Sequence, residues 1–146
     1  MTTSVPPLGE SFDRTVPEIV HAYVAAFCRH DLDAYAQTFA EEGVYDYPGA
    51  SSPARKEQLK EILEPLWTGF PDVVWETAAL ARVSAAQCVW VWVLEGTHTG
   101  DLYGTPATQR RVRWPGCEFI AFRPDAILRV QAYFDFEELR RQLATV

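Results

Sequence analysis

The chain has 146 residues, enough for one domain with a substantial hydrophobic core. Its formal net charge of -7 at pH 7 argues against nucleic-acid binding, which requires a clustered basic surface. No apolar run approaches the roughly 20 residues of a membrane span, and the first residues lack the basic-then-apolar order of a signal peptide. We therefore expect a cytoplasmic protein with neither nucleic acid nor membrane among its partners.

The cysteines and the arginines exclude two further kinds of site. The three cysteines are widely spaced and form no C-x-x-C pair, so they support neither a disulfide framework nor a zinc ribbon, and no metal is expected. Arg110, Arg111 and Arg113 form the one basic cluster. We interpret it as solvated or salt-bridged surface, because such clusters are usually a solvated face of the protein.

The N-terminal half of the chain has helical spacing of its apolar residues. Residues 1–14 are expected to form a flexible arm, and residues 15–146 a single domain. A first helix is predicted to begin near Thr15, with Pro17 in its first turn. A second helix is predicted to be capped by Asp31 and ended by Gly43. Between it and a third helix, which Pro53 is predicted to open, lies a short extended segment at residues 44–47.

From Val73 onward the pattern changes to the alternation typical of strands. Short turns between the strands predict antiparallel neighbours, and a last helix is expected from Glu137 to Leu143. The predicted fold class is α+β: a cone-shaped α+β barrel whose N-terminal helices pack on a strongly curved, mainly antiparallel four-stranded sheet and leave a cavity. The four predicted strands cover residues 73–82, 87–98, 110–123 and 126–136.

The second of these strands is unusually rich in tryptophan. Because strand side chains alternate between faces, Trp90, Trp92 and Leu94 share one face, and the intervening valines share the other. Both faces are apolar, so both are expected to be covered. The tryptophans either pack in the core or line an aromatic ligand pocket.

Several stretches, in this order along the chain, resemble the SnoaL-like polyketide cyclases of the nuclear-transport-factor-like superfamily. They are HDLDAYAQTFAEEGVYDYPG (30–49), FPDV (70–73), GTHTG (96–100), GTPATQRRV (104–112) and YFDFEELRRQL (133–143). The last stretch is also similar to limonene epoxide hydrolase. The resemblance implies a pocket walled by sheet and helices, without metal or organic cofactor, a hydrophobic small-molecule substrate, and a homodimer that buries the outer sheet face.

The resemblance also implies where the acid/base groups would lie. In the cyclases an aspartate on the last strand works with a histidine on the strand before it. Here the corresponding residues are Ala132 and Glu118, so the usual pair is absent, because alanine has no proton to exchange. Asp135 follows three residues after the aspartate position, and we expect it to cap the final helix.

Glu118 interrupts an otherwise apolar strand and is the main candidate for chemistry. Burial there would raise its pKa towards the range useful for a general acid or base. The alternative is a surface or interface glutamate paired with Arg129. The catalytic candidates are Glu118, Tyr45 and Tyr47; the substrate-binding candidates are Tyr23, Trp67, Trp92, Trp114, Ala132 and His98.

The roles of the tyrosines and of the histidine stay open at this point. Tyr45 and Tyr47 are either phenol donors in a cavity or part of the core rim. His98 is expected to hold the crossover at residues 99–110 in place, with catalysis as the alternative. Such a crossover can fold over the mouth of a cone as a lid.

The function that this pattern favours is a cyclase of natural-product, polyketide-type biosynthesis, such as antibiotic biosynthesis. It would close a ring, by an aldol-type step or a cycloaddition, in a bulky apolar intermediate that the aromatic pocket holds folded. Two alternatives remain: an epoxide hydrolase in which Glu118 replaces the lost aspartate, and a non-catalytic binding protein for an apolar small molecule.

Overall fold

A computed structural model of the chain describes residues 13–144. The predicted N-terminal arm therefore lies outside the described residues, except for Asp13 and Arg14. No helix within the described part is long and apolar enough to span a bilayer. The elements in chain order are α1 (Glu18–Cys28), α2 (Leu32–Gln37), β1 (Phe39–Asp46), β2 (Ala54–Arg55), a 3-10 turn (Lys56–Gln58), α3 (Leu59–Gly69), β3 (Val74–Ser84), β4 (Gln87–Thr97), β5 (Arg111–Arg123), β6 (Ala126–Phe134) and α4 (Phe136–Leu143).

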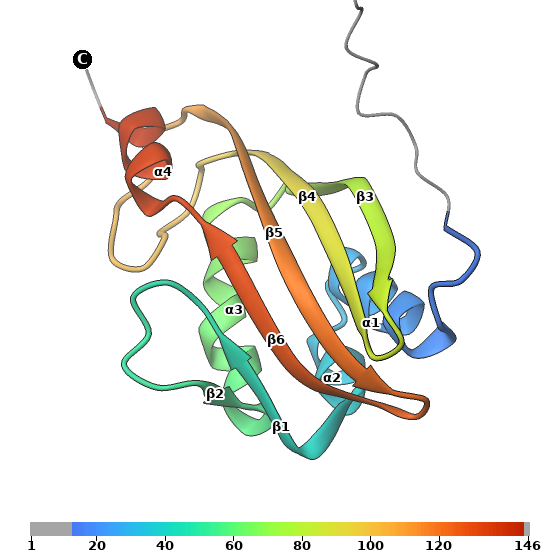
Figure 1. The fold of residues 1–146 in the computed structure, drawn as a ribbon. Coiled ribbons are helices and arrows are strands. Elements are labelled where there is room, and N and C mark those ends of the chain that lie inside the picture. The colour runs from blue at the N-terminus through green and yellow to red at the C-terminus, as the bar shows by residue number, and fades with distance from the viewer. Residues whose placement is uncertain (1–12, 145–146) are drawn as a thin grey trace, which may run out of the picture.

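The strands form one curled, mixed sheet in the order β2-β1-β6-β5-β4-β3 (Figure 1). The predicted α+β cone and its antiparallel meander from β3 to β6 are confirmed. The predicted strand number was too low, because two further strands extend the sheet beyond β6. Of these, β1 pairs with β6 in parallel and β2 pairs with β1 in antiparallel fashion.

The predicted second helix was too long. It ends at Gln37, and Phe39 already belongs to β1, opposite Ile127 of β6. Gly43 is part of an irregularity in the β1–β6 register, where an added Cβ would lie 2.9 Å from the carbonyl oxygen of Ala40 and 3.0 Å from that of Ile127. The glycine therefore permits a close backbone approach inside a strand and does not end a helix.

Two predicted helix starts lay too early in the chain. The residues after Pro53 form β2, because Ala54 pairs with Tyr45, and α3 begins only at Leu59. The first helix begins at Glu18, after a turn in which Asp13 accepts hydrogen bonds from the backbone and the side chain of Thr15.

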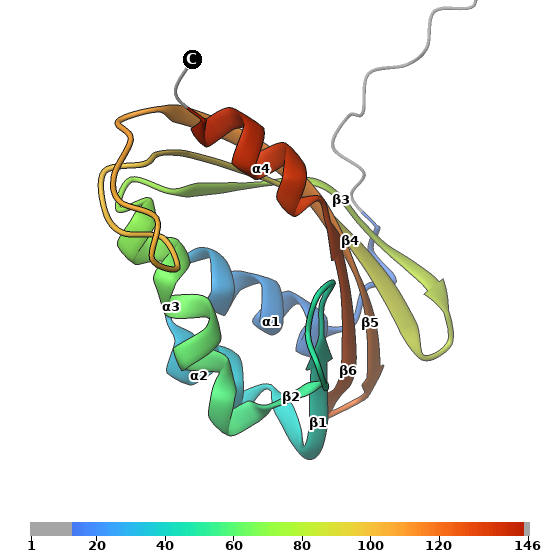
Figure 2. The same ribbon diagram turned by 90° about the vertical axis from the view of Figure 1, so that its left-hand side faces the viewer.

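Helices α1, α2 and α3 lie against the concave face of the sheet, and α4 crosses one end of it (Figure 2). The largest fully buried side chains come from both layers: Tyr23 and Tyr35 from the helices, and Trp90 and Ile120 from the strands. The inner wall of the cone is therefore aromatic as well as aliphatic.

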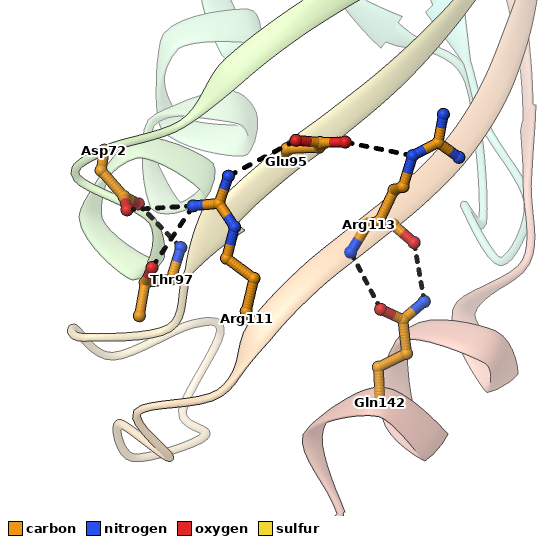
Figure 3. A network of polar contacts seen from close by, with 6 residues as sticks. All are labelled: Asp72, Glu95, Thr97, Arg111, Arg113 and Gln142. Atoms are coloured by element: carbon orange, nitrogen blue, oxygen red, sulfur yellow. Dashed lines mark hydrogen bonds and ion pairs between the residues drawn. The ribbon is translucent and has the colours of Figure 1, made fainter.

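The outer face of the same sheet carries a polar network (Figure 3). Arg113 donates to Glu95 at 3.0 Å, and Arg111 lies 3.4 Å from Glu95 and 3.5 Å from Asp72. The interpretation of Arg111 and Arg113 as salt-bridged surface is thus confirmed. Gln142 of α4 joins this network through two hydrogen bonds to the backbone of Arg113, at 3.0 and 2.8 Å, which fasten the helix to β5.

Candidate active site

A cavity of about 430 Å³ lies between the inner face of the sheet, the helices and the crossover from β4 to β5. Its wall is mostly apolar and aromatic, as is usual for small-molecule sites. The lining residues are Phe27, Tyr45, Tyr47, Ile62, Leu63, Leu66, Trp75, Trp92, Leu102, Tyr103, Thr105, Trp114, Glu118, Phe134, Phe136, Leu139, Arg140 and Leu143.

Glu118 reaches this cavity because the side chains of β5 alternate between the two faces of the sheet. Its side chain lies on the inner face with Trp114 and Ile120, and only 2% of its surface is exposed. The alternative pairing with Arg129 is not made, since Arg129 lies 3.5 Å from Asp46. The structure therefore places a carboxyl group, which has no cationic partner among residues 13–144, in the wall of an apolar cavity.

Both oxygens of Glu118 accept hydrogen bonds from buried aromatic side chains. The hydroxyl of Tyr23 donates to Oε1 at 2.5 Å, and the indole Nε1 of Trp92 donates to Oε2 at 3.2 Å. Behind Tyr23, the hydroxyl of Tyr35 donates to the Tyr23 oxygen at 2.9 Å. An indole N–H can only donate, whereas hydroxyls can reverse direction. When Glu118 is protonated, the proton can therefore lie on Oε1. Glu118 then donates to the hydroxyl of Tyr23, and Tyr23 donates to the hydroxyl of Tyr35.

Burial raises the pKa of Glu118 to about 7, and the hydrogen bonds from Tyr23 and Trp92 limit the rise. Burial also raises the pKa of Tyr23 and of Tyr35 well above its ordinary value, and the neighbouring Glu118 adds to the effect. The phenols therefore stay protonated at neutral pH, while the carboxyl group is divided between its two forms.

Trp92 can reach Glu118 because a glycine lies opposite it in the register. Gly116 of β5 pairs with Trp92 of β4, and an added Cβ at this position would overlap the six-membered ring of the indole. The indole thus lies across β5 towards Glu118, two residues further along the strand. A glycine inside a predicted strand is a sequence feature that can indicate such an approach.

Tyr45 lines the cavity from β1 and Tyr47 from the position directly after its end, with ring centroids 6.0 Å apart. Unlike Tyr23 and Tyr35, they have no hydrogen-bond partner for their hydroxyls among residues 13–144. Burial raises the pKa of Tyr45 well above its ordinary value. Tyr45 thus remains a neutral donor, available to an oxygen atom of a bound molecule.

Trp92 and Trp114 line the cavity as proposed, but the other predicted binding residues do not. Tyr23 lies behind Glu118 and acts on it through a hydrogen bond. Trp67 lies outside the wall, packed on Phe27 and Trp75 with centroid distances of 5.0 and 5.9 Å. Ala132 is fully buried on β6, directly opposite Glu118 in the strand pairing.

His98 is also fully buried and lies outside the cavity wall. Its Nδ1 accepts a hydrogen bond from the backbone N–H of Thr108 at 3.2 Å, and its backbone exchanges hydrogen bonds with Gln109 and Arg110. These contacts hold the two ends of the crossover together.

The middle of the crossover forms part of the cavity wall. Leu102 and Thr105 exchange backbone hydrogen bonds around a tight turn, in which Tyr103 and Gly104 have φ of 48° and 88°. The hydroxyl of Tyr103 donates to the carbonyl oxygen of Ile62 in α3 at 2.7 Å. The turn is thereby fastened over the cavity next to α3.

Sequence reasoning missed most of the lining residues. Three of the missed residues differ in how readily they could have been found. Arg140 shares the helical spacing of Phe136 and Leu143 and so followed a visible pattern, whereas Trp75 is the one buried residue of a strand whose burial does not alternate. Tyr103 lies in an irregular turn, where no periodicity exists. Within residues 13–144, no group of three His, Cys, Asp or Glu side chains is arranged to hold a metal ion.

A curled sheet closed by helices around a cavity defines the nuclear-transport-factor-like class of α+β cones. A family model described as SnoaL-like polyketide cyclase matches residues 17–143, and the chain belongs to this family. The resemblance seen in the sequence is thus confirmed. No curated protein sequence matches the chain.

Solved structures of the same fold have low sequence identity to this chain. A candidate SnoaL-like polyketide cyclase from Jannaschia sp. CCS1 is 15% identical with a TM-score of 0.77, over 92% of this chain and 99% of that one. IdmH from Streptomyces antibioticus, named as a candidate polyketide cyclase, is 19% identical with a TM-score of 0.75, over 87% and 96%. AclR from Streptomyces galilaeus, named as a candidate hydroxylase, is 19% identical with a TM-score of 0.74, over 86% and 78%. At these identities the likeness concerns the fold alone.

Proposed function

We propose that this protein is a cyclase that closes a ring in a bulky apolar, polyketide-type intermediate. The observation that carries the proposal is the carboxyl group of Glu118, which is buried in the wall of an aromatic cavity with its pKa raised to about 7. A general acid/base is most effective when its pKa lies near the working pH. The family name is consistent with this reaction class.

The carboxyl group occupies an unusual strand for this family. The resemblance implies an aspartate at the position of Ala132 on β6, whereas Glu118 lies opposite this position on β5. Residues paired across strands have Cβ atoms about 4.5–5.5 Å apart, and glutamate is one methylene longer than aspartate. A carboxyl group offered from β5 could therefore serve the same part of the cavity.

An aldol-type ring closure can be written with these groups. The Glu118 carboxylate takes a proton from the carbon next to a substrate carbonyl, and the hydroxyl of Tyr45 or Tyr47 donates to the enolate oxygen that forms. The enolate carbon then attacks a second carbonyl of the same molecule and forms the ring bond. Glu118 returns its proton to the new alkoxide, so the enzyme ends in its starting state.

The shape of the cavity would lower the reaction barrier more than acid/base catalysis by Glu118. A flexible chain held folded in an apolar space of about 430 Å³ brings its reacting carbons together. Such orientation can lower a barrier by ~7–11 kcal/mol in favourable intramolecular reactions. A cycloaddition would use the same space and need only one hydrogen bond to a carbonyl.

Proton abstraction can be tested without the natural substrate. Apolar ketones such as 2-tetralone are incubated with the protein in D₂O, and deuterium uptake next to the carbonyl is followed by NMR. We expect the wild-type protein to accelerate the exchange and Glu118→Gln to lose about 100-fold or more of the acceleration. Glu95→Gln, which makes the same change on the outer face of the sheet, should retain it.

The proposal fails if Glu118→Gln exchanges deuterium as fast as the wild type. The acid/base role also fails if ketones bind but no exchange is accelerated, which would leave a cycloaddition or a non-catalytic binding protein. A parallel incubation of an apolar epoxide in ¹⁸O-labelled water addresses hydrolysis. Solvent oxygen in the product would replace the cyclase proposal by an epoxide hydrolase.

A homodimer remains part of the proposal. The outer sheet face exposes 38% of Phe119 and 50% of Tyr133, whose rings lie 6.1 Å apart, beside the valines of β4. Apolar surface of this kind suits a self-complementary interface. We expect sedimentation analysis to give twice the chain mass and Phe119→Glu to give the monomer; a monomeric wild type would contradict this part.

A further inference from the structure

Helix α4 carries a cation on the face that it turns to the cavity. Phe136, Leu139, Arg140 and Leu143 follow the spacing of one helical stripe, and all four line the cavity. Arg140 is the only cation among the lining residues of the described chain. The other three residues of the stripe are apolar, so Arg140 is its one charged member, in a protein whose net charge is -7.

The orientation of this stripe is set by contacts at both ends of α4. At the start, the side chain of Asp135 accepts from the backbone N–H groups of Glu137 and Glu138, as the cap predicted from the sequence. The Asp135 carbonyl also accepts from Trp114 of the cavity wall at 2.8 Å. Near the end, Gln142 is bonded twice to the backbone of Arg113 (Figure 3). These contacts fix the orientation of α4, and with it the backbone position of Arg140.

The guanidinium of Arg140 retains unused donors. Its Nη1 lies 2.8 Å from Glu137 one turn earlier, and no other described residue bonds the group. A guanidinium has five N–H donors, so one edge is free to bind a planar anion such as a carboxylate.

The two ionisable groups of the wall lie in different surroundings. The side chain of Arg140 is 77% exposed, whereas Glu118 is 2% exposed. From these exposures we place Arg140 at the mouth and Glu118 at the buried end of a cavity whose other lining residues are mostly apolar and aromatic. An anion is disfavoured beside the buried carboxyl group and favoured beside the guanidinium.

We infer that the substrate class of this cavity is an apolar molecule with a single anionic group at one end, which Arg140 binds at the mouth while the apolar body extends towards Glu118. This inference rests on the proposed function, since it concerns the same cavity. It assigns a direction of entry and a charge to the ligand. Neither follows from membership of the family.

Two fluorescent probes with the same ring system test the inference. 8-Anilinonaphthalene-1-sulfonate carries one anionic group, and N-phenyl-1-naphthylamine is its neutral counterpart. Dissociation constants are measured for both, and competition between them establishes that they share the cavity. We expect Arg140→Gln to weaken the anionic probe about 5-fold to 10-fold and to leave the neutral probe within about twofold.

Two further variants of α4 give matched comparisons. Arg141 is paired with Glu138 three residues earlier, as Arg140 is with Glu137, but it does not line the cavity, so Arg141→Gln should change neither constant. Glu137→Gln should strengthen the anionic probe, because it frees the guanidinium of Arg140.

The outcomes separate this inference from the proposed function. The anion subsite is wrong, although the cavity is not, if the neutral probe binds and Arg140→Gln leaves the dissociation constant of the anionic probe unchanged. The same holds if Arg141→Gln weakens the anionic probe as much as Arg140→Gln does. If Arg140→Gln weakens both probes equally, its role is packing and the inference is likewise wrong. If neither probe binds, the cavity takes no apolar guest, and the inference fails together with the proposed function.

Discussion

Glu118 and Glu95 lie on adjacent strands of one sheet but on opposite faces. Glu95 is partly exposed to solvent and forms ion pairs with two arginines (Figure 3). In the same network, hydrogen bonds from Thr97 lower the pKa of Asp72. Glu118 meets Tyr23 and Trp92 in an apolar wall, and burial raises its pKa to about 7.

The difference shows that the two faces of one sheet give carboxyl groups different roles, structural on the outer face and, as we propose, catalytic on the inner face. The outer network offers cations and solvent, so its carboxylates form exposed ion pairs with arginines of β5, while Gln142 fastens the helix. Among the described residues, Glu118 accepts hydrogen bonds only from the neutral donors Tyr23 and Trp92, so its carboxyl group can hold a proton near neutral pH. The predictions below test this contrast, starting with the largest expected effect.

Glu118→Gln should abolish a pH dependence of the free energy of unfolding. The unfolded chain releases the Glu118 proton near the ordinary pKa of 4.5, whereas the folded chain holds it to about 7. The folded state therefore binds more protons between these values. The stabilisation that this group contributes is complete below about pH 4.5 and is lost as the pH rises through about 7. The loss lowers the free energy of unfolding by roughly 3 kcal/mol. Denaturant unfolding of both proteins near pH 5 and pH 8 measures the loss; equal pH slopes would contradict the prediction.

Tyr23→Phe should destabilise the fold by about 1.5–3 kcal/mol at pH values where Glu118 is ionised, because a buried carboxylate loses a donor. The pKa of Glu118 should rise further, since this hydrogen bond lowers it. Tyr45→Phe removes a hydroxyl that bonds no described residue and should change the free energy of unfolding by less than about 0.5 kcal/mol. Unfolding near pH 8 compares the two variants, and equal losses would refute the role of Tyr23.

Gly116→Ala should cost about 1–3 kcal/mol, because the new methyl group displaces the indole of Trp92. The near-ultraviolet circular dichroism of the tryptophans should change with it. Cys117→Ala alters the neighbouring residue, which points to the other face, and serves as the control. A spectrum and a stability that are unchanged in Gly116→Ala would show that Trp92 does not lie across β5.

Glu95→Gln should have the smallest effect, below about 1 kcal/mol, because exposed ion pairs contribute little. The pH slope of the wild type between about pH 5 and pH 8 should persist in this variant. If the slope disappears instead, the outer face is its source, and the contrast between the two faces is lost.

Much of the sheet could be predicted because its signals are local. The strands β3 to β6 and the helix α4 follow alternation, turn residues and the Asp135 cap, each readable within a few residues. The inward direction of Glu118 follows from the same alternation. The family resemblance suggested that this face lines a cavity.

The remaining features depend on pairings between distant segments. Gly43 is compatible with a helix end until β6 is placed beside β1. The reach of Trp92 depends on the register that sets Gly116 opposite it, and Tyr23 meets Glu118 only when α1 packs on the sheet. Local sequence patterns carry none of these long-range distances.

The central claim is that Glu118 holds its proton to near-neutral pH inside the cone. Selective ¹³C labelling of glutamate side chains, with Glu118→Gln to assign the resonance, allows its carboxyl carbon to be titrated directly by NMR. We predict a midpoint at about 7, well above the ordinary 4.5. A midpoint at or below 4.5 would show an ionised, solvated carboxylate and contradict the account.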